Sequence, residues 1–279
     1  MNRQERAEAE AREEARAKRS RLIVRWVIIG VLVLGAALLY SLLSGGGDDQ
    51  TVAGSSETTE QVPADTALES RPDCPAEDGS SPRTISFPAP PSLCIDAEDL
   101  LAADFVTSEG DFTAILDPTL DPRSVNNFVV LARYHAYDGT IFHRVIDDFV
   151  IQGGDLQNQF GTGGPGYRFT GAFPPEDVPY QVGSLAMANS GDPSSNGSQF
   201  FIVTGGAGAN LPQNYSLLGQ VTDGVDVPVA IQGTETEVRE VEGGRPAADV
   251  PVTDVVIESV SIRDATDDEI SAYEELVDR

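Results

Sequence analysis

The residues best suited to chemistry lie in one short stretch, FHRVIDDFVIQGGD, which runs from residue 142 to residue 155. It sets a histidine, an arginine and a glutamine among large apolar residues in an alternating, strand-like order. An arginine in such a pattern costs stability unless its charge is paired or used. Two interpretations are therefore open. Arg144 either forms a structural ion pair with an acid such as Asp147 or Asp155, or displays a working cation beside an apolar pocket.

Other catalytic chemistries find little support in the sequence. The chain has only two cysteines and two histidines, so a zinc site would have to recruit carboxylates, and no ligand spacing suggests one. The residues offer no nucleophilic triad. GTGGPG at 161–166 lacks the Lys-Ser/Thr that follows in a phosphate-binding loop. We therefore expect neither a metal nor a cofactor.

The elements that position this stretch begin near Ala97. Leu100–Asp117 predicts two strands around a Ser-Glu-Gly-Asp turn, and Asp121 and Pro122 predict the N-cap and first residue of a helix. Short alternating runs then follow, punctuated by Gly and Asn, and residues 249–265 predict a last long strand. Many short strands with few helices are typical of an antiparallel barrel or sandwich.

Five blocks follow one another within Asn127–Val221: FHRVI..F.IQGGD, GTGGPG, SLAMANSG, NGSQFFI and LLGQV. In order and spacing they resemble the blocks of the cyclophilin family of peptidyl-prolyl cis-trans isomerases. The resemblance covers roughly Asp96–Arg263. It implies a mainly β fold, a closed eight-stranded antiparallel barrel capped by two helices at Ser124–Arg133 and near Val225–Ile231. Pro228 is an awkward residue inside the second helix.

The resemblance implies catalysis of rotation about X-Pro peptide bonds. Rotation passes through a twisted amide that has lost its resonance, with a barrier of about 20 kcal/mol, and no bond breaks. The imide nitrogen becomes basic only in the twisted state. A donor aimed at this nitrogen therefore binds the transition state better than either ground state. Arg144 matches the family's catalytic arginine and is expected to be that donor.

The remaining site residues follow from the same blocks. Phe149 matches the pocket phenylalanine, and Gln152 and Asn189 match residues that hold the substrate backbone, which completes the expected catalytic set. The resemblance implies that the rest of the pocket and groove is lined by Val150, Gly161, Ala188, Ser190, Gln199, Phe201, Leu211 and Tyr215. His143 is expected beside the site as a satisfied structural residue.

Four features depart from the family's pattern. Asp147-Asp148 replaces the usual Pro-Gly and places two acids near the arginine. Asn210 replaces a pocket-rim Trp, which predicts weak cyclosporin binding. Tyr215 replaces a pocket His and still donates a hydrogen bond, and Val150 replaces a Met and gives a smaller pocket floor. We expect isomerase activity, at a level that these departures retune.

The N-terminal part of the chain predicts a membrane anchor. We expect a charged cytoplasmic segment at 1–21, a transmembrane helix at 22–43 and a flexible acidic linker at 44–73. Residues 26–43 carry no charge and would span roughly 27 Å as a helix. The basic excess precedes this run, so the N-terminus should stay in the cytoplasm. A cleaved signal peptide is the alternative, and both interpretations place the rest of the chain outside the cytoplasm.

The two cysteines fit that placement. In an oxidising compartment Cys74 and Cys94 are expected to form a disulfide, which closes the Pro- and Ser-rich segment 74–95. The isomerase domain then occupies 96–264, and an acidic C-terminal tail helix is expected at 265–279.

The charge of the chain argues against nucleic acid as a partner. The net charge is −27, and the basic excess of the first residues makes the remainder more acidic still. We predict a single-pass, membrane-tethered isomerase that acts on proline-containing unfolded or flexible segments of secreted or envelope proteins. The alternatives are a proline-peptide binding module or chaperone with little catalysis, which the departures favour, and a structural spacer of the envelope.

Overall fold

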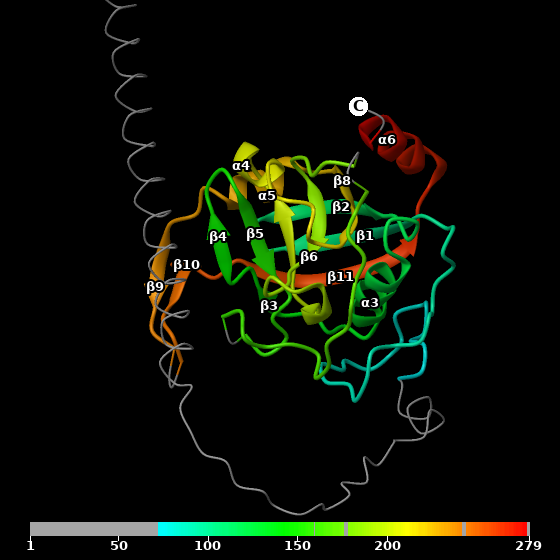
Figure 1. Cartoon of the computed structure of the whole chain (residues 1–279), viewed down its shortest axis with the longest axis horizontal. Helices are drawn as coiled ribbons and strands as arrows, with labels where there is room; N and C mark the ends of the chain where they lie inside the picture. The colour runs from blue at the N-terminus through cyan, green and yellow to red at the C-terminus, as the bar shows by residue number, and fades with distance from the viewer. Residues whose placement is uncertain (1–71, 159, 176–177, 242–243, 278–279) are drawn as a thin grey trace, which may run out of the picture. The chain divides into compact units, whose positions relative to one another are not determined.

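The computed structural model describes residues 72–158, 160–175, 178–241 and 244–277, and most of the regular structure in this part of the chain is strand (Figure 1). The strands are β1 (Leu101–Thr107), β2 (Gly110–Leu116), β3 (Thr140–Ile141), β4 (Arg144–Ile146), β5 (Val150–Gly153), β6 (Ser184–Met187), β7 (Phe200–Val203), β8 (Leu217–Asp223), β9 (Thr236–Arg239), β10 (Ala247–Pro251) and β11 (Val256–Asp264). The helices are α3 (Pro122–Arg133), the 3-10 helix η1 (Pro193–Ser195), α4 (Gly206–Ala209), α5 (Asp226–Ile231) and α6 (Asp267–Val277). This composition confirms the mainly β fold that the sequence predicts.

Nine of the described strands form one antiparallel sheet in the order β3-β11-β1-β2-β8-β6-β7-β5-β4, and β9 pairs with β10 in a separate hairpin. The structure thus differs from the expected closed eight-stranded barrel, because the described ladder has nine strands and two ends. The end strands β3 and β4 are separated only by Phe142 and His143. Phe142 N–H still donates to Val255 O (3.0 Å) before the chain bends away from β11. One bent segment therefore supplies both ends of the sheet.

The sheet is covered on both faces at β1 and β2. Side chains alternate along each strand, so Phe105 and Phe112 point into the main core, where their rings stack with centroids 4.5 Å apart. Ile115 lies on the opposite face and packs with Tyr273 of α6. The Tyr273 hydroxyl donates to Asp117 Oδ2 (2.9 Å). The C-terminal helix α6 therefore packs back on the sheet.

Helix α3 begins where the sequence predicts. Asp121 is the N-cap, and its Oδ1 accepts hydrogen bonds from the backbone N–H groups of Arg123 and Ser124, both at 3.2 Å. Pro122 occupies the first turn, where its missing N–H costs no hydrogen bond. Phe128, on the apolar face of the helix, is fully buried in the main core.

Helix α5 explains Pro228. The helix begins at Asp226, so Pro228 falls in its first turn rather than in its interior. The N–H groups of a first turn have no partner within the helix, and a proline there removes no hydrogen bond. The second helix thus lies near the expected Val225–Ile231, with Pro228 in a position that a helix tolerates.

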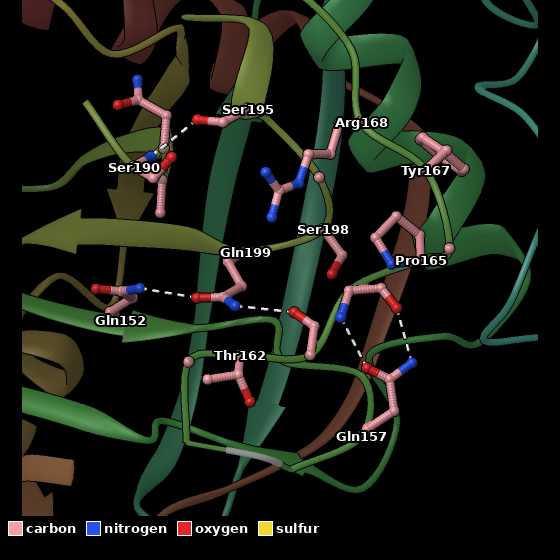
Figure 2. Close-up of a pocket in the computed structure, with 17 residues that line it drawn as sticks. Gln152, Gln157, Thr162, Pro165, Tyr167, Arg168, Ser190, Ser195, Ser198 and Gln199 are labelled. Carbon is pink, nitrogen blue, oxygen red and sulfur yellow. Dashed lines mark hydrogen bonds between the residues drawn. The ribbon is translucent and has the colours of Figure 1, made fainter. Parts of the chain in front are cut away.

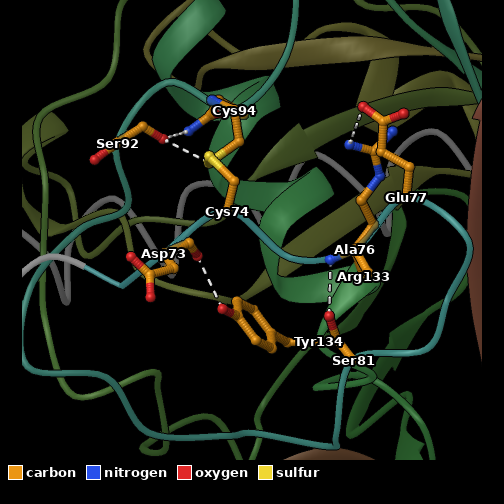
Figure 3. The surroundings of a disulfide bond; sticks show 10 residues. Asp73, Cys74, Ala76, Glu77, Ser81, Ser92, Cys94, Arg133 and Tyr134 are labelled. Carbon is orange, nitrogen blue, oxygen red and sulfur yellow. Dashed lines mark hydrogen bonds and ion pairs between the residues drawn. A yellow bond between two sulfur atoms is a disulfide. The ribbon is translucent and has the colours of Figure 1, made fainter.

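Cys74 and Cys94 form the predicted disulfide, with their Cα atoms 5.4 Å apart (Figure 3). The segment that they close is attached to α3 and the residue that follows it. Asn126 Oδ1 accepts from Cys94 N–H (2.7 Å), and the Tyr134 hydroxyl donates to Asp73 O (2.8 Å). These bonds attach the disulfide-closed segment and its flank to the first half of α3 and to the residue after its last turn.

The predicted cytoplasmic segment 1–21, the predicted transmembrane helix 22–43 and residues 44–71 of the predicted linker lie outside the described residues. Within the part of the chain that the structure describes, none of the helices has the length and apolar character needed to cross a bilayer.

Candidate active site

Strand alternation sorts the residues around Arg144 onto two faces. β4 pairs with β5 so that Arg144 lies opposite Gln152, and β5 pairs with β7 so that Gln152 lies opposite Phe201. The adjacent residues Ile151 and Ile202 are fully buried in the main core. Since successive side chains of a strand point to opposite faces, Arg144, Gln152 and Phe201 share the face away from that core.

A small pocket lies on this outer face. Its volume is about 110 Å³, well below the roughly 300–1,000 Å³ of sites for drug-sized ligands, so it suits a single small side chain. The pocket is lined by Arg144, Phe149, Val150, Gln152, Ala188, Asn189, Phe201, Leu211 and Tyr215. All of these residues belong to the site that the family resemblance implies. The fold therefore gathers residues from several strands and loops between positions 144 and 215 around one cavity.

The apolar walls of the pocket are rigidly supported. The Phe201 ring meets the Tyr215 ring edge-on, with centroids 5.2 Å apart. Tyr215 is held in turn by the Tyr180 hydroxyl, which donates to Tyr215 O (2.7 Å) and accepts from Tyr215 N–H (3.1 Å). Burial raises the pKa of Tyr180 to about 12, so this hydroxyl stays neutral. Sequence reasoning missed Tyr180, because no motif distinguishes it from any other buried tyrosine.

Arg144 lies at the rim of the pocket with its side chain 40% exposed. Its Nη1 donates to Gln152 Oε1 (3.4 Å), and its Nε lies 3.7 Å from Asp249 Oδ2 on β10. Among the described residues it pairs with neither Asp147 nor Asp155, the partners expected if the arginine were structural. The guanidinium is therefore held loosely at the surface rather than consumed in a buried ion pair.

Two acids close to Arg144 in sequence, Asp148 and Asp155, accept hydrogen bonds from backbone N–H groups. Asp155 is fully buried, and its Oδ2 accepts from the N–H groups of Gly161 (2.8 Å) and Gly163 (3.0 Å). Asp148 has a left-handed backbone, with φ of +56°, and its Oδ1 accepts from Gly206 N–H (2.9 Å). Asp and Asn tolerate this conformation better than most residues, which explains how Asp148 replaces the family's usual Gly.

A chain of side-chain amides orders the polar side of the site (Figure 2). Gln152 Nε2 donates to Gln199 Oε1 (2.9 Å), and Gln199 Nε2 donates to Gly163 O (2.9 Å). Each amide oxygen accepts from the preceding group and each amide nitrogen donates to the next, starting from Arg144. Because the donors run in one direction, the chain fixes which amide atom of Gln152 faces the arginine.

A larger, open cleft of about 1,000 Å³, whose lining residues are drawn in Figure 2, adjoins the pocket through shared residues. The two cavities share Gln152, Ala188 and Asn189 as lining residues. The cleft is also lined by the remaining predicted site residues, Gly161, Ser190 and Gln199. Every residue assigned to the site from the sequence therefore lies on one continuous surface.

Asn189 is fixed by its own side chain. Its Nδ2 donates to Asn214 O (2.8 Å), and its Oδ1 accepts from Gly191 N–H (2.9 Å). The expected role of this residue is to hold the substrate backbone. Since the side chain is engaged within the protein, the main-chain groups of Asn189 are the better placed to take that role.

His143 lies next to Arg144 in sequence but points the other way. It is 2% exposed, and neither ring nitrogen has a hydrogen-bond partner in the described structure. Burial lowers the pKa of His143 to about 4, so the ring is neutral near pH 7. His143 is not among the residues that line the pocket or the cleft, which fits a structural position beside the site, although its ring is not the satisfied one that the sequence suggests.

Comparison with known proteins gives this geometry a family context. The family model described as cyclophilin type peptidyl-prolyl cis-trans isomerase/CLD matches residues 102–262. Peptidyl-prolyl cis-trans isomerase B of Streptomyces anulatus is 42% identical over 179 residues, which cover 58% of this chain and 96% of that protein. Peptidyl-prolyl cis-trans isomerase A of Mycobacterium tuberculosis is 41% identical over 176 residues, which cover 56% of this chain and 88% of that protein.

Solved structures show the same likeness. A cyclophilin type peptidyl-prolyl cis-trans isomerase from Cryptosporidium parvum is 28% identical, with a TM-score of 0.53, and the match covers 60% of this chain and 99% of that one. A second crystal structure of that protein, in the presence of the dipeptide Ala-Pro, gives a TM-score of 0.51 at 29% identity and covers 59% and 99%. The matched length of each structure is thus essentially its whole chain.

Proposed function

This chain belongs to the cyclophilin family and is a peptidyl-prolyl cis-trans isomerase, and from that premise we propose that Arg144 is the group that stabilises the twisted X-Pro bond. The observation that carries the proposal is the position of the guanidinium. It lies partly exposed on the rim of a small pocket whose walls include Phe149, Val150 and Phe201. A cation beside an apolar pocket of this size suits a proline ring and the nitrogen attached to it.

The pocket residues divide the work of catalysis. The apolar walls hold the proline ring, so that rotation moves the carbonyl side of the bond. As the amide twists, the lone pair of the imide nitrogen localises and accepts a hydrogen bond from Arg144. Gln152 keeps the guanidinium oriented through Nη1. A hydrogen bond from a charged donor is worth about 1.5–3 kcal/mol, or roughly 10- to 150-fold in rate when it forms only in the transition state.

Peptide binding at this site has support from a relative. The Cryptosporidium parvum cyclophilin was crystallised in the presence of Ala-Pro, the smallest peptide with an X-Pro bond. We extend that ligand class to this chain, with the ring in the pocket and adjoining peptide residues in the open cleft. Family membership also favours the isomerase over a proline-binding module without catalysis.

The decisive experiment measures exchange of a proline-containing peptide by NMR with the full chain and its Arg144→Ala variant. We expect kcat/KM to fall roughly 10- to 150-fold, because the variant loses a bond made only in the transition state. Arg144→Lys keeps the charge but not the planar fork, and should recover part of the rate. An unchanged rate in Arg144→Ala, with the fold intact by circular dichroism, would remove the arginine from the mechanism.

We also propose that the enzyme works outside the cytoplasm on secreted or envelope proteins, tethered by residues 22–43. Two features support this placement: the uncharged run at 26–43 and the disulfide between Cys74 and Cys94, since such bonds persist in oxidising compartments. Cell fractionation with protease treatment of intact spheroplasts tests it. We expect the wild-type domain in the membrane fraction and degraded by external protease.

A matched variant sharpens the test of the anchor. Leu34→Arg places a charge in the middle of the run, which costs about 2.5–3.5 kcal/mol of insertion free energy. It should shift the protein out of the membrane fraction, while Leu93→Arg, at an exposed position of the described domain, should not. Equal partitioning of the two variants would count against the anchor.

A further inference from the structure

The outer edge of β4 lies beside an element that is not part of the pocket or the cleft. β4 is an end strand, paired with β5 on one side. Its other side faces β10, which belongs to the separate β9–β10 hairpin (Figure 1). This hairpin comes about a hundred residues after the sequence blocks around Arg144, between α5 and β11.

The hairpin presents one carboxylate to the arginine. The pairing of β10 with β9 shifts register between Ala247 and Val250, so Asp249 lies at a bulge. Its backbone is left-handed, with φ of +60°. A bulge redirects side chains, and here the Asp249 Oδ2 lies 3.7 Å from Arg144 Nε, with the two side chains 43% and 40% exposed.

The hairpin is anchored to the domain, so this contact does not depend on a free loop. Val250 is fully buried beside Asp249. Arg239 of β9 pairs with Asp254 (3.1 Å) and donates through Nη2 to Pro251 O (2.8 Å). The same guanidinium lies over the ring of Phe160, 5.2 Å from its centroid, next to the loop that lines the cleft. The hairpin is thereby tied to the turn before β11 and to the residue that precedes Gly161 of the cleft.

The two partners of Arg144 leave one end of the guanidinium available. Gln152 engages Nη1 and Asp249 lies against Nε. Among the described residues nothing accepts a hydrogen bond from Nη2. Because the guanidinium is planar, contacts at Nη1 and Nε bias the direction in which Nη2 points.

We propose that Asp249 is a positioning residue for the isomerase reaction, holding the Arg144 guanidinium from its Nε side so that the remaining N–H groups face the proline nitrogen. The inference rests on the proposed role of Arg144. Asp249 does not touch the substrate and acts only through the arginine. An exposed ion pair is weak, so its loss should lower kcat about 2- to 5-fold and leave peptide affinity unchanged.

Two substitutions remove the carboxylate without straining the backbone. Asn and Gly both adopt φ near +60° readily, so Asp249→Asn and Asp249→Gly keep the bulge. Asp147→Asn is the matched control, because it removes an exposed carboxylate three residues from Arg144 that forms no ion pair in the described structure. NMR exchange with the full chain gives kcat, and peptide titration gives Kd.

Both Asp249 variants should lower kcat about 2- to 5-fold, and Asp147→Asn should leave kcat unchanged. Raising salt from 0.1 to 1 M should bring the wild type toward the Asp249→Asn rate, because screening weakens an exposed ion pair. The NMR signal of the Arg144 Nε–H should shift in both Asp249 variants and stay unchanged in Asp147→Asn. In an Arg144→Ala background, Asp249→Asn should have no further effect, since its only route to the reaction is gone.

Three outcomes overturn the inference. Unchanged kcat in both Asp249 variants, while Arg144→Ala is impaired, refutes the role of Asp249 alone. A higher kcat would mean that the carboxylate competes with substrate for the guanidinium. An unchanged rate in Arg144→Ala would refute the proposed function and this inference together.

Discussion

The two halves of the site are built in different ways. The apolar pocket rests on β5, β6 and β7, inside the ladder, and its residues Val150 and Phe201 are only 3% and 4% exposed. The proposed donor lies on the end strand β4, and the Arg144 side chain is 40% exposed. The pocket therefore belongs to the folded core, whereas the rim is supported by surface contacts. Substitutions in the pocket should cost stability, and substitutions at the rim should cost rate.

Phe201→Ala should give the largest effect on stability. Truncating a buried phenylalanine costs about 3–5 kcal/mol of the free energy of unfolding, and this ring also packs edge-on against Tyr215. We expect about 3 kcal/mol, because one side of the ring already faces the pocket. Chemical denaturation measures it, with Arg144→Ala as the control that should stay within about 0.5 kcal/mol of the wild type. Equal losses in the two variants would contradict the division between pocket and rim.

His143 precedes Arg144 in the chain but, unlike the arginine, is buried. Its pKa is lowered to about 4 by burial, against an ordinary value of about 6.5. Between these values the unfolded chain binds a proton that the folded chain does not. The free energy of unfolding should therefore fall by roughly 3 kcal/mol as the pH falls from about 6.5 to about 4, and no further His143 contribution should be lost below that.

The test compares pH-dependent denaturation of the wild type and His143→Gln. The variant should lack this component and keep the part that arises from the carboxylates. His135→Asn is the control, since His135 is partly exposed. Its backbone has φ of +54°, a conformation that Asn adopts readily. The same pH dependence in wild type and His143→Gln would mean that burial of this ring does not govern acid stability.

Much of the pocket could be predicted because local patterns determine it. In FFIV the alternation alone assigns Phe200 and Ile202 to one face and Phe201 and Val203 to the other. The family's blocks then identify which face binds ligand. Asp121 could likewise be predicted as an N-cap, because capping depends on residues two and three positions away.

The rim could not be predicted in the same way. Asp249 meets Arg144 only because a hairpin far along the chain packs beside β4 and bulges at that residue. The acids close in sequence, Asp147 and Asp155, were the reasonable candidates. No local sequence pattern shows that the Asp155 carboxylate accepts hydrogen bonds from the N–H groups of Gly161 and Gly163 instead. The ladder of nine strands depends in the same way on a bend at 142–143, which a strand-like pattern does not reveal.

Tyr180→Phe should give a smaller effect that links the two halves. The variant loses the hydroxyl that bonds to both main-chain groups of Tyr215, at 2.7 and 3.1 Å. We expect a loss of about 1 kcal/mol in the free energy of unfolding and a raised KM, because the pocket wall loosens. The value of kcat should change little, since Arg144 keeps its own partners. A loss confined to kcat would contradict the assignment of this tyrosine to the pocket.

The smallest effect on the isomerase reaction is expected at Asn210, where the family often carries a tryptophan. Asn210 is exposed, its Nδ2 donates to Gly206 O (2.7 Å), and it is not among the residues that line the pocket, although its neighbour Leu211 is. Asn210→Trp should tighten cyclosporin binding by about tenfold, which corresponds to about 1.4 kcal/mol of new apolar contact, and leave kcat/KM for a short peptide nearly unchanged. Asn210→Ala removes the same amide without adding a ring and should bind cyclosporin with the affinity of the wild type. Fluorescence titration of the three proteins measures the difference. Equal affinities would contradict the expectation that Asn210 weakens cyclosporin binding, and Val150, with its smaller side chain, would be the next position to change.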